Sequence, residues 1–495
     1  MGEMLEKAYD LVWGVPALVL ILGVGLYLSI RTGFAQIRLF PAAFRAFWHR
    51  LWNREAQPDG VSPFQALCTA LAATVGTGNL AGVAGAMAIG GPGAIFWMWV
   101  CAIFGMITKL AEAALSVRYR IRCHGELLGG PMYMITCGMG SRWNWLACTY
   151  CFFGVIAAFG VGNATQINAV ITSINDCITA FGGNVSRTAD LVMGMTLAIL
   201  VLLLLLGGAG RVGALTEKMV PLAAAAYLLL GSFVLLVRAE AVPGAFAAIF
   251  QGAFSPEAAT GGMVGSLMST LRIGVSRGVF TNEAGMGTAG IAHGSANAVH
   301  PVDQGLMGIM EVFLDTVVIC TMTALVILCS GIGIPYGVDV GVSLTSDAFS
   351  SVLGDWVKVF IAGALCLFAF ATVLGWGIYG ARCAQYLFGR NVWKKFAWLQ
   401  ALTVMVSAML NTGTVWQIAE IVNGLMAIPN LTALAVLSPE LCRLIHEYKK
   451  ITGHRAGGGT LCRYPSTQTA ASPLPCGSST PLRWRQRKKE RRFTT

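Results

Sequence analysis

Charged residues are scarce in this chain of 495 residues: Asp, Glu, Lys and Arg make up 12%, against 56% hydrophobic residues. This balance argues against several soluble domains and indicates one polytopic membrane domain. The formal net charge of +11 would by itself suggest a nucleic-acid partner. However, 12 of the 34 basic residues lie after Cys442, and most others fall in every second loop, as in cytoplasmic loops of membrane proteins. We therefore expect a lipid bilayer as the partner, and no nucleic acid.

Catalytic and cofactor motifs are also missing from the sequence. It contains no HExxH motif, no DxxD cluster, and no Ser or Cys beside a His in an apolar segment. Its one CxxC motif, Cys148 to Cys151, has no second pair to complete a metal site. His293 and His300 lack a carboxylate at ligand spacing. We expect neither an enzyme nor a cofactor, and the acidic start MGEMLEKAYD does not indicate a signal peptide.

The stretch Leu71–Trp97 carries no charge, so we expect it to lie in the membrane. From Thr74 to Asn79 it reads TVGTGN, a composition with weak helix propensity. In hydrocarbon, an unwound turn is tolerated only where it is buried in protein or lines a polar cavity. We predict a broken helix beside a polar site, where free carbonyls suit a small cation and a helix N-terminus suits a carboxylate. The alternative is that the glycines only allow close helix packing.

Four stretches of the chain follow, in order, the motifs of a transporter family. They are TVGTGNLAGVAGAMAIGGPGAIFWMW from Thr74, GGPMYMI from Gly129, RGVFTNEAGMGTAGIAHG from Arg277 and ATVLGWGIYGARC from Ala371. They resemble the alanine or glycine:cation symporter family over roughly residues 63–440. The resemblance implies a LeuT-type fold with a five-plus-five inverted repeat, and transport of alanine or glycine with Na+ as the coupling ion.

The expected fold is an all-α polytopic membrane protein with about 11 transmembrane helices, one of them an extra N-terminal helix. Residues 1–60 hold this helix and a basic cytoplasmic loop, residues 61–440 the ten-helix core, and residues 441–495 a basic, disordered tail. Before the tail, 17 basic residues fall in segments predicted cytoplasmic and four in external ones. This count predicts the N-terminus outside and the C-terminus in the cytoplasm, and we expect the membrane to be the plasma (inner) membrane. The oligomeric state stays open.

A second broken helix is expected in the second half of an inverted-repeat transporter. We place its two parts at residues 245–254 and 263–273, because the sequence SPEAATGG interrupts the apolar pattern between them. The polar stretch from Arg277 to Gln304 then falls on the cytoplasmic side.

Few charges lie inside the predicted spans. Lys109 and Glu112 are three residues apart on one helix face, and we expect them to pair with each other. Glu311 is expected near the cytoplasmic edge, where it is open to solvent. Asp315 lies deeper and is expected to be functional or ion-paired.

The candidate site combines both breaks with two further helices. By analogy with LeuT-type carriers, Na+ is held by backbone oxygens of Thr74 and Val75 and side-chain oxygens of Asn79 and Thr372. Backbone N–H groups of the first break bind the substrate carboxylate, carbonyls near residues 262–265 accept its ammonium, and Trp376 limits its size. The resemblance adds Gln166, in the third core helix, which we expect at about residues 145–174. The complete expected substrate set is Gly76, Thr77, Gly78, Asn79, Gln166, Met263, Gly265, Leu267, Thr372 and Trp376.

The expected function is therefore secondary active import of a small neutral amino acid, alanine or glycine, with Na+. The alternatives are an H+-coupled carrier, a carrier of a broader set of small amino acids, and a channel. Saturable uptake driven by a Na+ gradient would distinguish this Na+-coupled transporter from a channel, which conducts without saturating.

Overall fold

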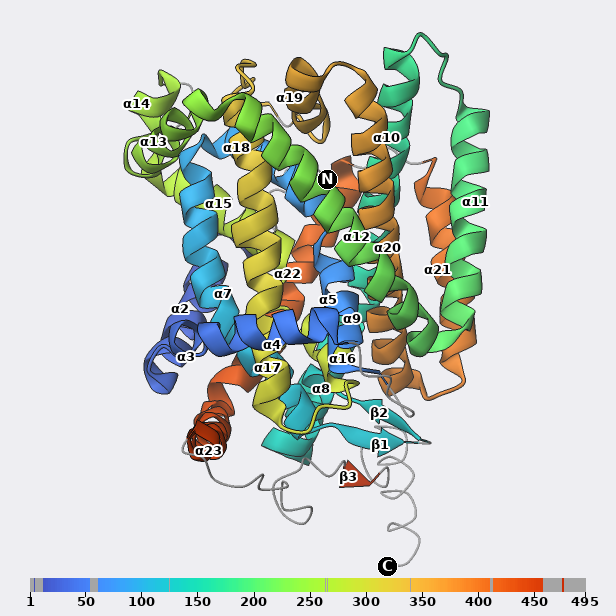
Figure 1. The fold of residues 1–495 in the computed structure, drawn as a ribbon. Helices are drawn as coiled ribbons and strands as arrows, with labels where there is room; N and C mark the ends of the chain where they lie inside the picture. Colours follow the sequence, from blue (N-terminus) through green and yellow to red (C-terminus); the bar gives the residue numbers. More distant parts are fainter. Residues whose placement is uncertain are drawn as a thin grey trace, which may run out of the picture.

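The computed structural model describes residues 12–53, 61–123, 125–262, 264, 266–338, 340–409 and 413–456, together with Met4 and residues 474–475. Most of these residues are helical, as the sequence predicts (Figure 1). The first helices are α2 (Val15–Thr32), α3 (Ala35–Arg38) and α4 (Phe40–Trp52). Helix α2 is apolar with a proline in its first turn, and α4 carries both aromatic and basic residues.

The first half of the core contains eight helices within the described residues. They are α5 (Pro63–Thr74), α6 (Val83–Gly90), α7 (Gly93–Arg118), α8 (Pro131–Tyr133), α9 (Asn144–Phe159), α10 (Thr165–Ala180), α11 (Arg187–Leu206) and α12 (Gly208–Val237). Strands β1 (Ile121–Cys123) and β2 (Glu126–Leu128) pair antiparallel after α7, and β3 (Leu474–Pro475) lies parallel to β1. Wider π turns join several helices, at Gly78–Gly82, Met134–Met139 and Gly160–Ala164.

The second half continues the same all-helical pattern. Its helices are α13 (Val242–Phe254), α14 (Pro256–Thr260), α15 (Leu267–Asn282), α16 (Thr288–Gly294), α17 (Pro301–Val312), α18 (Thr321–Cys329), α19 (Ser343–Leu353), α20 (Trp356–Phe388), α21 (Val392–Ser407), α22 (Gly413–Val436) and α23 (Ser438–Ala456). A π segment, Phe313–Cys320, joins α17 to α18. The expected tail is thus helical up to Ala456, and of the residues after it the structure describes only 474–475.

Membrane spans can be counted from length and composition. Seven helical segments of the described chain are long and apolar enough to cross a bilayer, and an eighth is added if the bent pair Pro63–Thr74 and Gly78–Gly90 forms one span. Helix α2 is apolar but shorter. The polytopic all-α class is therefore confirmed, whereas the number of about 11 spans stays a prediction.

The core lies around α7, which packs against α15, α16 and α17, and around α20, which packs against α9, α10 and α12 (Figure 1). Helices α11 and α12 lie at the periphery. On α12, Leu222, Leu229 and Leu236 repeat every seven residues, and each is at least 70% exposed. Such an apolar stripe facing outward suits hydrocarbon, so these helices present their outer faces to lipid.

The interruption expected at SPEAATGG is present, because α13 ends at Phe254 and α15 begins at Leu267. The short helix α14 lies between them, and Gly261 and Gly262 after it are exposed. The second discontinuity of the buried core lies further along the chain, between Asn282 and Thr288, inside the stretch that we expected to be a cytoplasmic loop. Helix α15 packs there against the π turn of the first break, so these two discontinuities face each other.

Candidate functional site

The first discontinuity lies between α5 and the π turn Gly78–Gly82. Helix α5 starts with a capping box, in which Ser62 and Gln65 satisfy each other's backbone N–H groups, and its apolar run ends at Thr74. Val75 is extended, with φ −74° and ψ 102°, and the helix axes on either side differ by 52°. All residues from Val75 to Asn79 are buried. The predicted break is therefore present and enclosed by protein.

Uncharged side chains satisfy the backbone that this break frees. Asn79 Oδ1 accepts a hydrogen bond from Gly76 N at 2.9 Å, and Gln166 Oε1 accepts one from Thr77 N at 3.4 Å. Thr372 Oγ1 donates to the carbonyl of Ala72 at 2.9 Å and lies 3.4 Å from that of Val75. The hydroxyl of Thr77 is buried with no partner. The break thus gathers amide, hydroxyl and carbonyl groups without a net charge.

Gly76 is required at the centre of this group because there is no room for a side chain. A Cβ atom there would lie 2.7 Å from Thr372 Oγ1 and 3.1 Å from Gln166 Oε1. Three segments from distant parts of the chain, α5, α10 and α20, therefore meet at one glycine.

The π segment between α17 and α18 adds a carboxylate beside the first break. Asn79 Nδ2 donates to Asp315 Oδ1 at 2.8 Å, and Thr316 Oγ1 donates to Asp315 Oδ2 at 2.8 Å. Asn282, the last residue of α15, donates to Thr316 Oγ1 at 3.1 Å. Asp315 is fully buried, and no Lys or Arg of the described chain forms an ion pair with it. A buried carboxylate held only by neutral donors is suited to a bound cation.

The second discontinuity is held mainly by carboxylates. Glu283 has a left-handed backbone, with φ 52°. Its Oε1 accepts from Trp376 Nε1 at 2.8 Å and its Oε2 from Thr288 Oγ1 at 2.6 Å. From α7, Glu112 Oε1 accepts backbone N–H groups of Gly285 and Gly287 at 2.9 and 3.0 Å. Both side chains accept hydrogen bonds from residues at the start of α16, Gly287 and Thr288.

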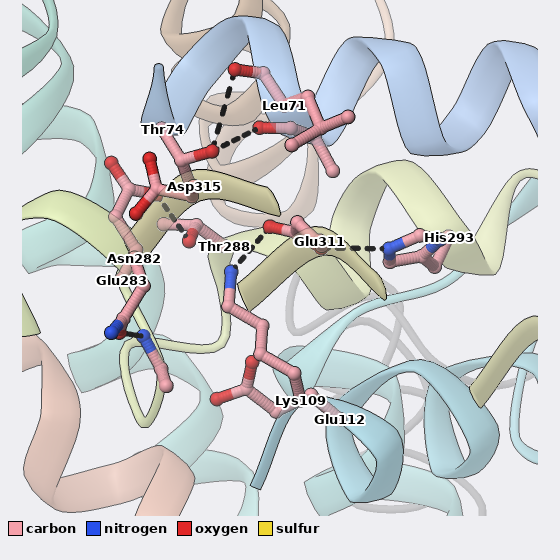
Figure 2. A network of polar contacts seen from close by, with 12 residues as sticks. Leu71, Thr74, Lys109, Glu112, Asn282, Glu283, Thr288, His293, Glu311 and Asp315 are labelled. Carbon is pink, nitrogen blue, oxygen red and sulfur yellow. Dashed lines mark hydrogen bonds and ion pairs between the residues drawn. The ribbon is translucent and has the colours of Figure 1, made fainter. Parts of the chain in front are cut away.

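The pairing expected between Lys109 and Glu112 is wrong. Lys109 Nζ instead lies 2.6 Å from Glu311 Oε1 on α17, as Figure 2 shows. His293 Nε2 lies 3.0 Å from Glu311 Oε2, and Gln304 Nε2 bonds both His293 Nδ1 and the carbonyl of Pro63. Glu311 is fully buried, so the expectation of a solvated position is also wrong. The partner of Lys109 lies on a neighbouring helix, and the spacing of residues along one helix cannot reveal a partner on another.

Comparison with known proteins assigns this chain to a family. A model of the sodium:alanine symporter family matches residues 1–457. The chain belongs to that family. The sodium/alanine symporter AgcS of Methanococcus maripaludis is 41% identical over 441 residues, which cover 88% of this chain and 94% of AgcS. The amino-acid carrier protein AlsT of Bacillus subtilis is 36% identical, covering 91% of this chain and 92% of AlsT.

A solved structure supports the fold. The crystal structure of MhsT in complex with L-phenylalanine superposes with a TM-score of 0.55 at 15% identity, and the match covers 79% of this chain and 99% of MhsT. The protein therefore has the LeuT-type fold. As a member of the sodium:alanine symporter family it is a multi-pass membrane transporter of amino acids, and not an enzyme.

The structure brings together part of the expected substrate set. Gly76, Thr77, Asn79, Gln166 and Thr372 are joined directly by the contacts described above. The next residue, Gly78, packs against α15, because a Cβ there would lie 2.9 Å from Thr281 Cγ2.

The remaining expected residues divide into three groups. Trp376 is fully buried beside the second discontinuity, and Gly162 packs against its Cβ. Leu267 begins α15 and is 43% exposed, and no described contact joins it to the first break. Met263 and Gly265 lie outside the described residues.

The expected Na+ ligands fall at two places in this symporter. Thr372 Oγ1 lies near the carbonyls of Ala72 and Val75, whereas Asn79 turns toward Asp315. The hydroxyl of Thr74 is bonded to carbonyls of its own helix, at Ala70 and Leu71 (Figure 2). The described residues contain no group of three His, Cys, Asp or Glu that could hold a metal, so any ion here depends on neutral oxygens and one carboxylate.

Sequence reasoning missed the residues around the second discontinuity. Glu112 accepts N–H groups of its backbone, Glu283 accepts from the side chains of Thr288 and Trp376, and Asn282 and Thr316 join it to Asp315. A signal was available, because the motif NEAGMG combines a carboxylate and two glycines as the first break combines threonines and glycines. Its polarity led us to place it in a loop.

Proposed function

We propose that this protein imports a small neutral amino acid, alanine or glycine, together with Na+. The observation that carries the proposal is the junction of the first break with Asp315. Uncharged hydrogen-bonding groups surround the break, which suits a zwitterion with no net charge. The buried carboxylate next to it lacks a cationic partner in the described chain, which suits a coupling cation.

In this proposal two places receive Na+. At the first, Thr372 Oγ1 and the carbonyls of Ala72 and Val75 turn from one another to the ion. At the second, the Asp315 carboxylate supplies oxygens, and Asn79 Oδ1 joins them once its amide turns away from Gly76 N. Both use hard oxygen ligands, as a small cation requires. The substrate carboxylate binds N–H groups of Gly76 and Thr77, and Gln166 adds a side-chain contact.

Relatives give the proposal its substrate range. AgcS is named for alanine, and GlnT of Bacillus subtilis, 35% identical over 461 residues, is named a probable sodium/glutamine symporter. A carrier of broader range is therefore the second candidate. The size of the pocket beside Trp376 decides between them, because one extra methylene is worth only about 1–3 kcal/mol in an apolar pocket.

The decisive experiment is uptake into proteoliposomes that contain only the purified protein. We expect saturable uptake of radiolabelled alanine or glycine under an inward Na+ gradient, and none when choline replaces Na+. Asp315→Asn keeps the shape but removes the charge, and should weaken Na+ dependence. Uptake driven by a pH gradient without Na+ would favour an H+-coupled carrier, and non-saturating flux would favour a channel.

We also propose that the protein lies in the plasma membrane in the orientation predicted from the basic loops. The N-terminus is then outside and the C-terminus in the cytoplasm. The basic residues of α4 and α23 support it, because both helices then lie on the cytoplasmic side. Reporter fusions at each terminus of the full chain test it: a C-terminal fluorescent protein should fold and fluoresce, and a C-terminal phosphatase should be inactive.

A further inference from the structure

Glu112 and Asn430 form a buried pair that transport of Na+ and amino acid does not explain. Glu112 lies on α7 and is fully buried, and Asn430 lies on α22 and is fully buried as well. Asn430 Nδ2 donates to Glu112 Oε1 at 2.7 Å and to the carbonyl of Gly285 at 2.9 Å. These two bonds fix the orientation of the amide, because the reverse orientation would set its oxygen against two other oxygens.

The pair leaves two oxygen atoms without partners. Glu112 Oε1 accepts three hydrogen bonds, from Gly285, Gly287 and Asn430, whereas Glu112 Oε2 accepts none. Asn430 Oδ1 is likewise buried without a partner. An unsatisfied buried acceptor costs about 1–3 kcal/mol, and more for a charged group, so two on adjacent side chains require an explanation. Both are acceptors, so what the pair lacks is a hydrogen to donate.

The other buried carboxylates of this region differ from Glu112. Glu311 has a partner on each oxygen, Lys109 and His293, and Glu283 has Trp376 and Thr288. Lys109 is thus paired with Glu311 and not with Glu112. Glu112 is the carboxylate with a vacant, unpaired oxygen and no ion pair within the described residues.

We propose that Glu112 is a proton-binding site, at which a proton on Oε2 is donated to Asn430 Oδ1. One proton then satisfies both orphaned atoms and closes a ring of two hydrogen bonds between the acid and the amide. It also removes a charge from the membrane interior. A metal cation fits this position poorly, because the groups around Glu112 that the structure describes are mostly N–H donors.

The proton would link three elements. Glu112 holds the backbone of the second discontinuity, and Asn430 joins that backbone to α22. Loss of the proton adds a further negative charge near the carboxylates of Glu311 and Glu283, which weakens the contact between α7 and α22. The ionisable groups that face Glu112 from the surrounding elements are Lys109, Glu283, Glu311, Tyr150 and Tyr379. The two tyrosine hydroxyls form no hydrogen bond to it.

The test is infrared difference spectroscopy of the purified full-length protein, titrated from neutral to alkaline pH. A protonated buried carboxyl gives a C=O band that ionised carboxylates lack. We expect wild type to show this band at neutral pH, Glu112→Gln to lack it, and Asn430→Ala to shift it, because its acceptor is removed. Glu283→Gln is the matched control at the same discontinuity: it leaves Lys109 paired with Glu311 and should leave the band in place.

A functional readout separates a proton site from a structural carboxylate. Because Gln has the shape and neutrality of the protonated acid, Glu112→Gln should fold and bind substrate with affinity within about threefold of wild type. We expect the affinity of wild type to decline at alkaline pH, and Glu112→Gln to lack this decline. A wild type without the band, or a band that survives in Glu112→Gln, would overturn the proposal. If Glu112→Gln does not fold, the shift in Asn430→Ala still decides it. The band does not depend on which substrate or coupling ion the protein uses, so it tests the proton site separately from the proposed function.

Discussion

The two discontinuities of the core have opposite chemistry although they face each other. At the first, Asn79, Gln166 and Thr372 satisfy freed backbone groups, and the hydroxyl of Thr77 is left without a partner. At the second, Glu112 and Glu283 accept from backbone and side-chain donors. Neutral partners can be exchanged for ligand atoms at little cost, whereas a buried carboxylate that loses its donors is strongly destabilised.

This difference suggests a division of labour. The first discontinuity is suited to binding and releasing ligands, because its groups are uncharged and one is already free. The second is suited to holding α15 and α16 in place, since its carboxylates come from α7 and from the break itself. Substitutions in the second should therefore act on stability first, and substitutions in the first should act on binding first.

The largest effect is expected from Gly287→Ala in the second discontinuity. Gly287 has φ 78°, and a Cβ there would clash with Pro131 Cγ and lie 2.8 Å from Asn430 Oδ1. Overpacking costs about 1–3 kcal/mol and a left-handed backbone about 1–2 kcal/mol more, so folding should be severely impaired. Thermal unfolding of purified protein in detergent measures it.

The control is Gly262→Ala, where φ is 81° but nothing lies within 4 Å of the added Cβ. It should lose only the backbone contribution of about 1–2 kcal/mol. Equal losses in the two variants would mean that the second discontinuity is not held by packing.

The sequence predicted the first discontinuity well and the second poorly, for a physical reason. TVGTGN lies within a long uncharged run, so its polarity marks an exception inside the membrane. NEAGMG lies in a longer polar stretch, and its burial comes from packing against α7 and α20, which no local pattern records. For the same reason Lys109 was assigned to Glu112 on its own helix, when Glu311 of α17 is its partner. The fold class, the all-α core and the residues around Gly76 were predictable because they follow from hydrophobic runs and motif order.

The second prediction concerns ligand binding at the first discontinuity. In Gly78→Val the new side chain meets Thr281, since a Cβ alone would lie 2.9 Å from Cγ2 and 3.3 Å from Cα. The break and α15 must move apart, so substrate binding should be abolished. Equilibrium binding of radiolabelled alanine measures it. Gly82→Ala is the control one turn away, where the nearest atom lies at 3.9 Å. Wild-type affinity in Gly78→Val would count decisively against a site at this break.

The third prediction concerns Na+ at the same discontinuity. Asn79→Ala and Thr372→Ala each remove one oxygen ligand, and each should raise the Na+ concentration for half-maximal uptake about three- to tenfold, equivalent to about 0.5–1.5 kcal/mol. Thr372→Ser keeps the hydroxyl and should stay close to wild type. Unchanged Na+ dependence in both alanine variants would refute the proposed ion ligands.

The smallest effect on alanine transport is expected from Trp376→Phe, at a residue that lies between the two discontinuities and so tests their separation most finely. Its indole donates to Glu283 at the second, and its ring is proposed to limit substrate size at the first. Trp376→Phe keeps an aromatic ring but loses the N–H donor, so it should lower thermal stability and retain selectivity for alanine.

Trp376→Ala should in addition admit valine or leucine, with a gain of about tenfold in their apparent affinity, because each buried methylene contributes about 1–3 kcal/mol. Competition of unlabelled amino acids against alanine uptake measures the accepted set. If Trp376→Ala transports alanine normally and gains no larger substrate, the ring serves only to hold Glu283, and the size of the substrate is set by other residues.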